Sequence, residues 1–549
     1  MPADVAIALS VALANEAQAR SQPSMSAIVF DRNGVVWSGT VGHVDPSRQR
    51  APSNLTRYRA GSISKLFTDI LLIQMVESGQ LSLDVPVTHY LPTFRPQSEF
   101  PTQITLRHLL SHTSGLVREP PVGSYFELGD PGSAAIVESL NSTRLVAAPG
   151  TVRKYSNAGL AVIGRLLEVV SGRDFDTLVQ DNLLRPAGMS RSQFNLAGIQ
   201  DDIAFAEMAP FGGNRRVAPV FDIGLKAAGG LNTTAADAAR FGIALLNGGM
   251  GENGRLLAQT TLEAMYQLQP VGGATASDVG LGFVIRSLDG DRMLGHSGGI
   301  YGFTSEFWLL PDRGVGVVVF GTVDGDDAPN RFARHALAVA RAERAGAQPP
   351  DAPRPPAPAS AALRAAMPGF YSDGAATTDI RLIDGKLLVQ TPTALGEIVQ
   401  RGGRIALDSD FGVAGSLTID PAGGWIDING RRFARIAPAL PDAAPEALST
   451  LFGDYGWDHQ YIRMFERDGH PYVMIEGIEL ARLIPVDRNT FEFPTTSILY
   501  ARERLVFSRG SDGQGTAISL NGIIFPRRAT SCQLCRSKGE RQRQPGWPD

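Results

Sequence analysis

The sequence predicts a multidomain protein in which one large α/β-type domain is followed by two small antiparallel β-domains. Strand-like and helical runs alternate up to about residue 346, which is typical of a large mixed domain. A proline-rich stretch then interrupts the pattern. Short runs of alternating polarity follow it, separated by Asp-Gly, Gly-Gly and Asn-Gly turns. The length of 549 residues fits about three or four domains at roughly 100–200 residues each.

The large domain is expected to span residues 1–346. Apolar strand patterns lie at 25–31 and 315–321, and helical patterns lie at 66–79 and 157–172. Strands and helices that alternate over this length predict a single domain in which both pack around one hydrophobic core.

The first residues, 3–24, have the pattern of an amphipathic helix packed on the large domain. A secretory signal needs basic residues before its apolar run, whereas the first ionisable side chain here is Asp4. We therefore expect a cytoplasmic protein, and a periplasmic location stays open if the natural chain begins upstream of this sequence. No run of about 18 apolar residues occurs, so no membrane span is expected.

The second half of the chain contains an internal repeat. GFYSDG begins at Gly369 and GDYGWD at Gly453, 84 residues later, and the Asn-Gly turns at 429 and 521 are 92 residues apart. This period predicts two similar β-domains, each long enough to close into a small barrel. A single long β-sheet domain with coincidental turns is the alternative. The predicted boundaries are 347–360 for the Pro-rich linker, 361–440 and 441–528 for the two β-barrel-like domains, and 529–549 for a disordered tail.

Charge and cysteine content exclude several classes of protein. Lys and Arg number 51 against 55 Asp and Glu, so the net charge is −4 and lacks the basic excess of nucleic-acid-binding proteins. The two cysteines, Cys532 and Cys535, have no second pair or His pair near them to complete a zinc site. We expect no disulfide scaffold, no metal, no cofactor and no nucleic-acid partner.

Ser62 and Lys65 form the first candidate site, within AGSISKLFTDILLIQMVESG. Of the five lysines in the chain, only this one has a serine three residues earlier. Residues three apart share one face of a helix, so the Ser62 hydroxyl and the Lys65 amine can meet, and Gly61 allows a sharp entry. Burial of this apolar helix lowers the pKa of the amine towards that of a useful base. Ser64 is the rival nucleophile, expected to point away from the lysine, and a surface coincidence is the alternative interpretation.

Tyr155 and Asn157 form the second candidate site, in the segment Tyr-Ser-Asn just before a helical pattern. Among eleven tyrosines, only Tyr155 has an asparagine two residues later. A phenol near a lysine can pass protons, and a carboxamide can orient a substrate carbonyl or the lysine. The alternative is that Asn157 caps the following helix and Tyr155 packs beneath it.

His296 begins the third candidate site, His-Ser-Gly-Gly. Of eight histidines, only this one is followed by Ser-Gly, and the glycines suit a strand that a ligand approaches closely. A backbone N–H at Gly298 or Gly299, most directly Gly299, could join the Ser62 N–H in an oxyanion hole. The alternative is a histidine on an edge strand beside a glycine-rich turn.

Together these motifs resemble the serine β-lactamase-like and penicillin-binding-protein-like hydrolases, above all their class C and D-aminopeptidase/esterase branch. The resemblance covers residues 25 to about 345 and includes 58–92, 104–116 and 155–172. It implies an antiparallel sheet flanked by helices. It also implies that Ser62 is acylated, that Lys65 is its base or a proton relay, and that Tyr155 moves protons for the attacking and leaving groups.

The resemblance departs from the β-lactamases at His296, where they have a lysine that helps to hold the carboxylate of the drug. A neutral imidazole lacks that charge, and histidine here is similar to D-aminopeptidases and related esterases. With two β-domains behind it, the catalytic domain is similar to D-aminopeptidases and to the peptidase that cuts linearised microcystin. We therefore expect a peptidase or amidase acting on small linear peptides with D- or non-standard residues, with β-lactamase activity weak or absent. A broad carboxylesterase and a non-catalytic binder of peptides or cell-wall fragments are the alternatives. The oligomeric state is left open, a homodimer included.

Overall fold

The computed structural model describes residues 1–208, 215–273, 278–353, 356–374, 377–383, 385–390, 395–401, 403–409, 417–437, 446–467, 470–476 and 479–528. The chain divides into two compact units, the first formed mainly by Met1–Met208 and Arg215–Ala352 and the second mainly by Pro353–Leu520. The tail predicted at 529–549, with Cys532 and Cys535, lies outside the described residues.

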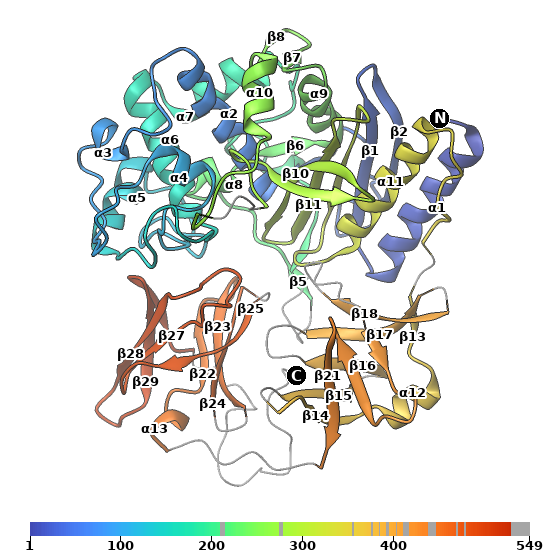
Figure 1. Cartoon of the computed structure of the whole chain (residues 1–549), viewed down its shortest axis with the longest axis vertical. Helices are drawn as coiled ribbons and strands as arrows, with labels where there is room; N and C mark the ends of the chain where they lie inside the picture. Colours follow the sequence, from blue (N-terminus) through green and yellow to red (C-terminus); the bar gives the residue numbers. More distant parts are fainter. Residues whose placement is uncertain are drawn as a thin grey trace. The chain divides into compact units, whose positions relative to one another are not determined.

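A six-stranded antiparallel sheet forms the centre of the first unit (Figure 1). In spatial order its strands are β2 (Gly34–Gly42), β1 (Ser24–Asp31), β12 (Val315–Gly321), β11 (Phe303–Leu310), β10 (Asp291–Ile300) and β9 (Val284–Leu288). The strands predicted from the sequence at 25–31 and 315–321 are confirmed. They pair directly, with Met25 opposite Gly321 and Asp31 opposite Val315. Strands β11 and β12 are buried along their whole length, which is typical of a sheet covered on both faces.

Two separate apolar cores cover the two faces of this sheet. On one face, Val29, Val317 and Val319 pack with α1 (Ala3–Ala19) and α11 (Ala328–Arg344), which lie together in Figure 1. On the other face, residues of opposite parity, such as Ile28 and Phe320, pack with the remaining helices. These helices are α2 (Ser64–Glu77), α4 (Leu106–Leu110), α6 (Asn157–Ser171), α8 (Lys226–Gly229) and α9 (Ala235–Leu246). Smaller elements of this unit are α3 (Val87–Tyr90), α5 (Ser133–Ser139), α7 (Phe175–Val179), α10 (Gln259–Met265), β3 (Arg57–Arg59) and β6 (Asn232–Thr234).

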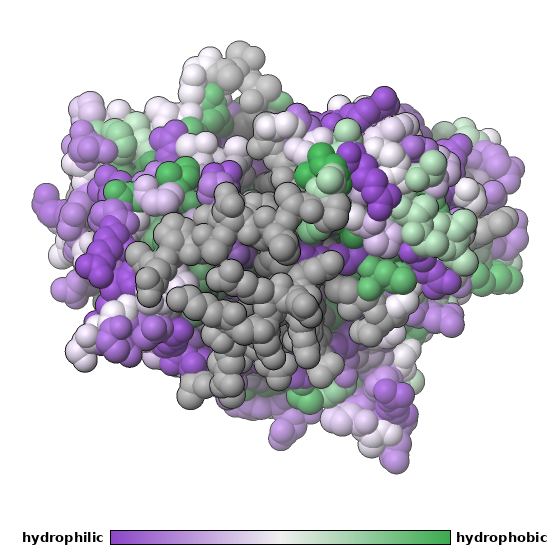
Figure 2. Space-filling model, turned by 90° about the horizontal axis from the view of Figure 1, so that it is seen from below, coloured by the Kyte–Doolittle hydropathy of each residue, from purple (hydrophilic) through white to green (hydrophobic). Residues whose placement is uncertain are grey.

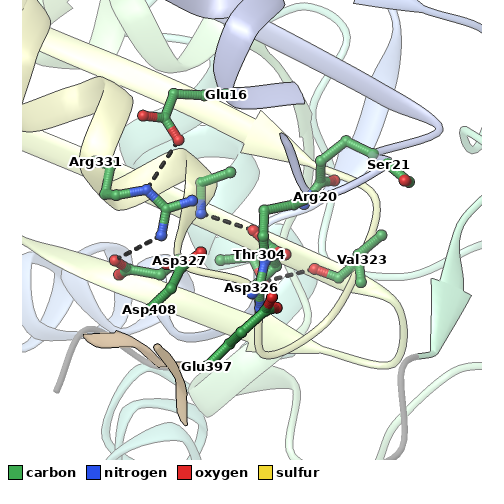
Figure 3. A network of polar contacts seen from close by, with 12 residues as sticks. Glu16, Arg20, Ser21, Thr304, Val323, Asp326, Asp327, Arg331, Glu397 and Asp408 are labelled. Carbon is green, nitrogen blue, oxygen red and sulfur yellow. Dashed lines mark hydrogen bonds and ion pairs between the residues drawn. The ribbon is translucent and has the colours of Figure 1, made fainter. Parts of the chain in front are cut away.

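The N-terminal helix is held to the domain by buried ion pairs as well as by apolar packing. The guanidinium of Arg331 on α11 donates to Glu16 on α1 at 2.8 Å and to Asp327 at 3.2 Å (Figure 3). Arg20, just after α1, donates to Asp326 at 2.7 Å. Glu16 is only 2% exposed, so its charge is balanced inside the protein rather than by water. The amphipathic helix predicted over 3–24 is therefore present as α1, which ends at Ala19 and is packed on this domain.

The second unit is built from antiparallel sheets, so the predicted fold class is confirmed. Its hairpins use the expected turns: Asn429 and Gly430 both have positive φ, 56° and 78°, as a two-residue type I′ turn requires.

The strands of the second unit form three sheets. The nine-stranded sheet consists of β13 (Ala357–Pro358), β14 (Gly369–Ser372), β15 (Thr377–Ile383), β16 (Lys386–Gln390), β17 (Leu395–Arg401), β18 (Arg404–Ser409), β19 (Leu417–Ile419), β20 (Trp425–Ile428) and β21 (Arg431–Ile436). A four-stranded sheet consists of β22 (Gly453–Gly456), β23 (Tyr461–Arg467), β24 (His470–Ile475) and β25 (Glu479–Arg482). A five-stranded sheet consists of β26 (Ile484–Pro485), β27 (Thr490–Glu492), β28 (Arg504–Arg509), β29 (Gly515–Leu520) and β30 (Ile523–Pro526), and two short helices are α12 (Ala361–Ala366) and α13 (Glu446–Ser449).

The sequence repeat in this unit corresponds to a repeated set of contacts. The hydroxyls of Tyr371 and Tyr455 each donate to the backbone carbonyl four residues earlier, at 2.7 Å in both cases. Arg435 lies over the ring of Tyr371 at 5.7 Å, and Arg527 lies over the ring of Tyr455 at 5.9 Å. Tyr371 with Arg435 and Tyr455 with Arg527 therefore make equivalent contacts in the two repeats, which supports an internal duplication. The division at residue 440 into two β-barrel-like domains stays a prediction.

One face of the molecule is mainly polar where its residues are described (Figure 2). Figure 2 shows one face on which hydrophilic residues form most of the coloured surface and hydrophobic residues are confined to small separate patches. Among the described residues, none of the helices has the length and apolar character needed to cross a membrane.

Candidate active site

The chain bends sharply before Ser62, and a glycine makes this bend possible. Gly61 has φ +52° and begins a short 3-10 turn, Gly61–Ile63, that leads from β3 into α2. A Cβ at this position would lie 2.8 Å from the backbone nitrogen of Gly299 and 2.9 Å from its oxygen. A side chain at 61 is therefore excluded both by conformation and by space. The close approach brings the turn that carries Ser62 against the end of β10.

The hydroxyl of Ser62 receives hydrogen bonds from two other predicted site residues. Lys65 Nζ lies 3.0 Å from Ser62 Oγ, and the Tyr155 hydroxyl donates to the same oxygen at 2.7 Å. Lys65 is 1% exposed and also donates to the backbone carbonyl of Ala228 at 2.8 Å. Its amine lies 4.9 Å over the ring of Tyr155. The geometry of an alcohol, a buried amine and a phenol within hydrogen-bond reach suits nucleophilic catalysis.

Ser64, the rival nucleophile, has a structural role instead. Its hydroxyl donates to the carbonyl of Gly61 at 2.6 Å and accepts from the backbone N–H of Leu231 at 2.9 Å. The residue is fully buried, so a substrate has no route to its oxygen. Ser64 stabilises the turn that presents Ser62.

Burial shifts the titration of Lys65 and Tyr155 in opposite directions. Desolvation disfavours the ammonium form and, with the nearby charge of Arg118, lowers the pKa of Lys65 from 10.5 to about 7, while Glu119 partly opposes this. Desolvation also disfavours the phenolate, so the pKa of Tyr155 is raised well above its usual 10. At neutral pH the amine is available as a base, whereas the phenol keeps its proton.

Asn157 is placed by its neighbours rather than by capping. Ser156 caps α6, its hydroxyl accepting from the backbone N–H of Gly159 at 3.0 Å, so the alternative interpretation of Asn157 as the cap is wrong. Asn157 is the first residue of the helix, and its Nδ2 donates to Glu119 Oε1 at 2.6 Å.

His296 lies beside the tyrosine and carries no charge at physiological pH. Its ring centroid is 6.2 Å from that of Tyr155, and its Nδ1 is 2.5 Å from the backbone oxygen of Ser297. Burial, together with the charge of Lys65, lowers the pKa of the imidazole to about 3. A neutral His296 supplies no positive charge for a substrate carboxylate.

The two glycines after His296 have different surroundings. Gly299 is exposed and faces the turn that carries Ser62. Gly298 is buried, and a Cβ there would lie 2.1 Å from the carbonyl oxygen of Ala60. Gly298 thus allows the strand to pack closely beneath the turn, and Gly299 is the glycine that a ligand can reach.

His112 adjoins the site and was not identified from the sequence. Its imidazole packs on Tyr155 with ring centroids 4.5 Å apart, and Nδ1 accepts from the backbone N–H of Ser156 at 3.3 Å. Its carbonyl accepts from the backbone N–H of Lys154 at 2.7 Å. Both neighbours of Tyr155 are thus held by one buried histidine, which fixes where the phenol points. The sequence feature that could have identified it is the histidine in LLSHTSGL, a segment whose resemblance to the family was used only to predict a helix and a turn.

Arg118 and Glu119 form a buried charged pair next to these groups and were also missed. They are 6% and 1% exposed, and Arg118 Nε lies 3.6 Å from Glu119 Oε1. The guanidinium lies 5.6 Å over the ring of Tyr155. Buried charges of this kind need partners, and here they lie where they influence both Tyr155 and Lys65. Two adjacent opposite charges in the otherwise uncharged stretch SHTSGLVREPPVG were the available signal.

Comparison with known proteins identifies a family by sequence and a similar fold among solved structures. The sequence profile of the β-lactamase family matches residues 12–342, more than half of the chain. A human β-lactamase-like protein is 31% identical over 331 residues, 58% of this chain and 65% of that protein. The D-alanyl-D-alanine-carboxypeptidase/endopeptidase AmpH of Escherichia coli (strain K12) is 26% identical over 313 residues, 54% of this chain and 79% of AmpH. The octameric penicillin-binding protein homologue from Pyrococcus abyssi has a similar fold, with a TM-score of 0.56 and 21% identity over 86% of this chain and 98% of that one.

Proposed function

Because the chain belongs to the β-lactamase family, we propose that it is a serine hydrolase that works through an acyl-enzyme. Its substrates are small linear peptides or amides with D- or other non-standard residues near the cut bond. The observation that carries this proposal is the pair of hydrogen bonds from Lys65 at 3.0 Å and Tyr155 at 2.7 Å to the Ser62 hydroxyl. The similarity to AmpH, whose name describes an enzyme that cuts bonds between D-alanine residues, supports the D-residue preference.

In the proposed acylation, neutral Lys65 takes the proton of Ser62 as the serine oxygen bonds to the substrate carbonyl carbon. The electron pair of the carbonyl moves to its oxygen, which is stabilised by the backbone N–H groups of Ser62 and Gly299. When the intermediate collapses, the C–N bond breaks and the leaving nitrogen takes a proton from the Tyr155 hydroxyl. Lys65 returns its proton to Tyr155, so the charges balance.

In the proposed deacylation the same groups work on water. Water attacks the acyl carbon while neutral Lys65 accepts its proton, and the second intermediate expels the Ser62 oxygen. The proton then returns to Ser62, the acid product leaves, and the free enzyme is restored. Lys65 is favoured as the base in both steps because its pKa is about 7, whereas that of Tyr155 is raised.

The neutral state of His296 supports weak or absent β-lactamase activity. Burial lowers its pKa to about 3, so no cation stands at the position where a β-lactam carboxylate would be held.

Labelling and turnover experiments test the proposal. A serine-reactive fluorophosphonate should label the full-length protein once, and Ser62→Ala should abolish the label. Ser64→Ala is the matched control and should keep it. The wild-type protein is then offered D-alanyl amides, linear peptides, p-nitrophenyl esters and a chromogenic cephalosporin, with the cut bond identified by mass spectrometry. Turnover of the esters with every amide intact would replace the peptidase proposal by an esterase. Label remaining on Ser62→Ala would move the nucleophile elsewhere.

A further inference from the structure

The carboxamide of Asn157 is held in one orientation by a carboxylate. Asn157 Nδ2 donates to Glu119 Oε1 at 2.6 Å, and a carboxylate can only accept hydrogen bonds. If the carboxamide turned over, its oxygen would face the oxygen of Glu119, which is repulsive. Glu119 itself cannot move aside, because its Oε2 accepts from the backbone N–H of Tyr125 at 3.0 Å and the residue is 1% exposed.

The oxygen of the same carboxamide is left for another partner. Asn157 is 7% exposed, and its Oδ1 is shielded from solvent and has no hydrogen bond to any described residue. A buried acceptor without a donor is costly, so such an atom beside an active site is best explained by a ligand that supplies the donor. The position fits this explanation, since Asn157 is two residues from Tyr155, whose hydroxyl contacts Ser62.

We propose that Glu119 turns the oxygen of Asn157 towards the substrate, and that the site thereby selects acyl groups carrying a nitrogen-bound hydrogen on their α-carbon. The leaving nitrogen faces the Tyr155 hydroxyl that protonates it, so the donor available to Asn157 is on the acyl side. A free α-amine and an α-acylamino group both supply such a hydrogen. This inference rests on the proposed function and narrows its substrate class to aminoacyl or acylaminoacyl compounds.

Glu119 is a positioning residue in this scheme, and its isosteric variant gives an unusual expectation. In Glu119→Gln only one side-chain oxygen remains to accept the hydrogen bonds that the two carboxylate oxygens accept in the wild type. The backbone N–H of Tyr125 cannot turn away, so the glutamine oxygen faces it and the glutamine NH₂ faces Asn157. The change also removes the negative charge that lies 3.6 Å from Arg118. Asn157 then rotates to offer its oxygen to the glutamine, and its NH₂ group turns to the substrate. A loss of preference for N–H donors without loss of the nucleophile is expected from this one-atom change.

Three phosphonate diesters that phosphonylate Ser62 make the test independent of turnover. One is the diphenyl ester of 1-aminoethylphosphonate, the second is its N-acetyl form, and the third is the ethylphosphonate, which lacks the α-nitrogen. Rates of labelling are measured by intact-mass spectrometry on the full-length protein. In the wild type, one buried hydrogen bond should favour an α-nitrogen probe about 10–100-fold over the ethylphosphonate. Comparison of the amine with its N-acetyl form shows which source of the N–H the site takes.

Variants separate recognition from general damage. Asn157→Ala and Glu119→Gln should reduce the preference to within about twofold of unity. The preference is a ratio of two rates measured on the same variant, so a general change in the reactivity of Ser62 affects both rates alike and cancels. Glu306→Gln is the matched control: this buried glutamate, 3% exposed, accepts from Ser297 and does not contact Asn157, so the preference should persist. Circular dichroism and thermal unfolding of each variant check that the fold is kept.

Two outcomes are clearly distinct. Equal rates for all three probes in the wild type, or a preference that survives in Asn157→Ala, would overturn the inference and leave the hydrolase intact. Absence of any labelling of Ser62 would overturn the proposed function and the inference with it.

Discussion

Replacing Lys65 by methionine should abolish hydrolysis and yet stabilise the protein at neutral pH. Each pKa unit corresponds to about 1.4 kcal/mol, so lowering the pKa from 10.5 to about 7 costs the folded state about 5 kcal/mol while the amine is protonated in water. Methionine fits a similar volume without this cost, but it leaves the carbonyl of Ala228, now bonded at 2.8 Å, without its donor, a loss of about 1–3 kcal/mol. At pH 7 the variant should be more stable by about 1–3 kcal/mol.

The sign of this effect changes with pH. The pKa of Lys65 is lower in the folded chain than in the unfolded one, so between about pH 7 and 10.5 unfolding takes up a proton and raising the pH stabilises the wild type. By pH 10 most of the ionisation cost is gone, and the lost hydrogen bond should leave Lys65→Met equal to the wild type or less stable.

Calorimetric unfolding of the full chain at pH 7 and pH 10 measures this reversal, since about 1 kcal/mol moves the midpoint of a large domain by about 2 °C. Lys226→Met is the matched control. Its amine is half-buried and paired with Asp130 at 2.9 Å, and its pKa is raised, so that variant should gain nothing at pH 7. A stability difference between Lys65→Met and the wild type that is the same at both pH values would refute the claim that Lys65 is a desolvated base.

Three further results are expected. The value of kcat/KM for an amide substrate should rise with pH through an acid limb near pH 7, since only neutral Lys65 accepts a proton; a flat profile between pH 6 and 8 would contradict this. Gly61→Ala should lower kcat at least about 100-fold, because φ is +52° and the new methyl group would lie 2.8 Å from Gly299 N; activity close to the wild type would show that the turn is not rigid. His112→Ala should lower kcat about tenfold or more with little change in KM, because the ring packed 4.5 Å from Tyr155 no longer fixes the phenol; an effect on KM alone would assign His112 to substrate binding.

The parts of the site that could be predicted from the sequence are those determined by local spacing. Ser62 and Lys65 are one helical turn apart, so their meeting needs only a helix. The strands at 25–31 and 315–321 were predictable because a sheet covered on both faces leaves continuous apolar runs. The β-sheets of the second unit were predictable because turns such as Asn429-Gly430 demand a positive φ that few other residues accept.

The residues that escaped prediction act through contacts between distant segments. Glu119 matters because it accepts from Asn157, 38 residues later in the chain, and nothing in the local sequence of either residue states this. His112 holds the backbone on both sides of Tyr155 through a turn in which it has φ +56°, a conformation uncommon for residues other than glycine. Ser156 and Asn157 are both good capping residues, and the sequence alone does not show that Ser156 caps α6 while Asn157 donates to Glu119.

The charges around Ser62 indicate which end of a substrate the site can hold. His296 is neutral at physiological pH, Lys65 has a pKa near 7 and so loses its charge above neutrality, and Arg118 is balanced by Glu119 at 3.6 Å. An approaching carboxylate would therefore lose its hydration and gain little attraction from these groups. An amine or amide N–H on the acyl side, by contrast, would find an acceptor already desolvated at Asn157. Under the proposed function, a preference for nitrogen-bearing acyl groups would distinguish an aminoacyl hydrolase from a general esterase, and this preference depends on the orientation of the Asn157 carboxamide.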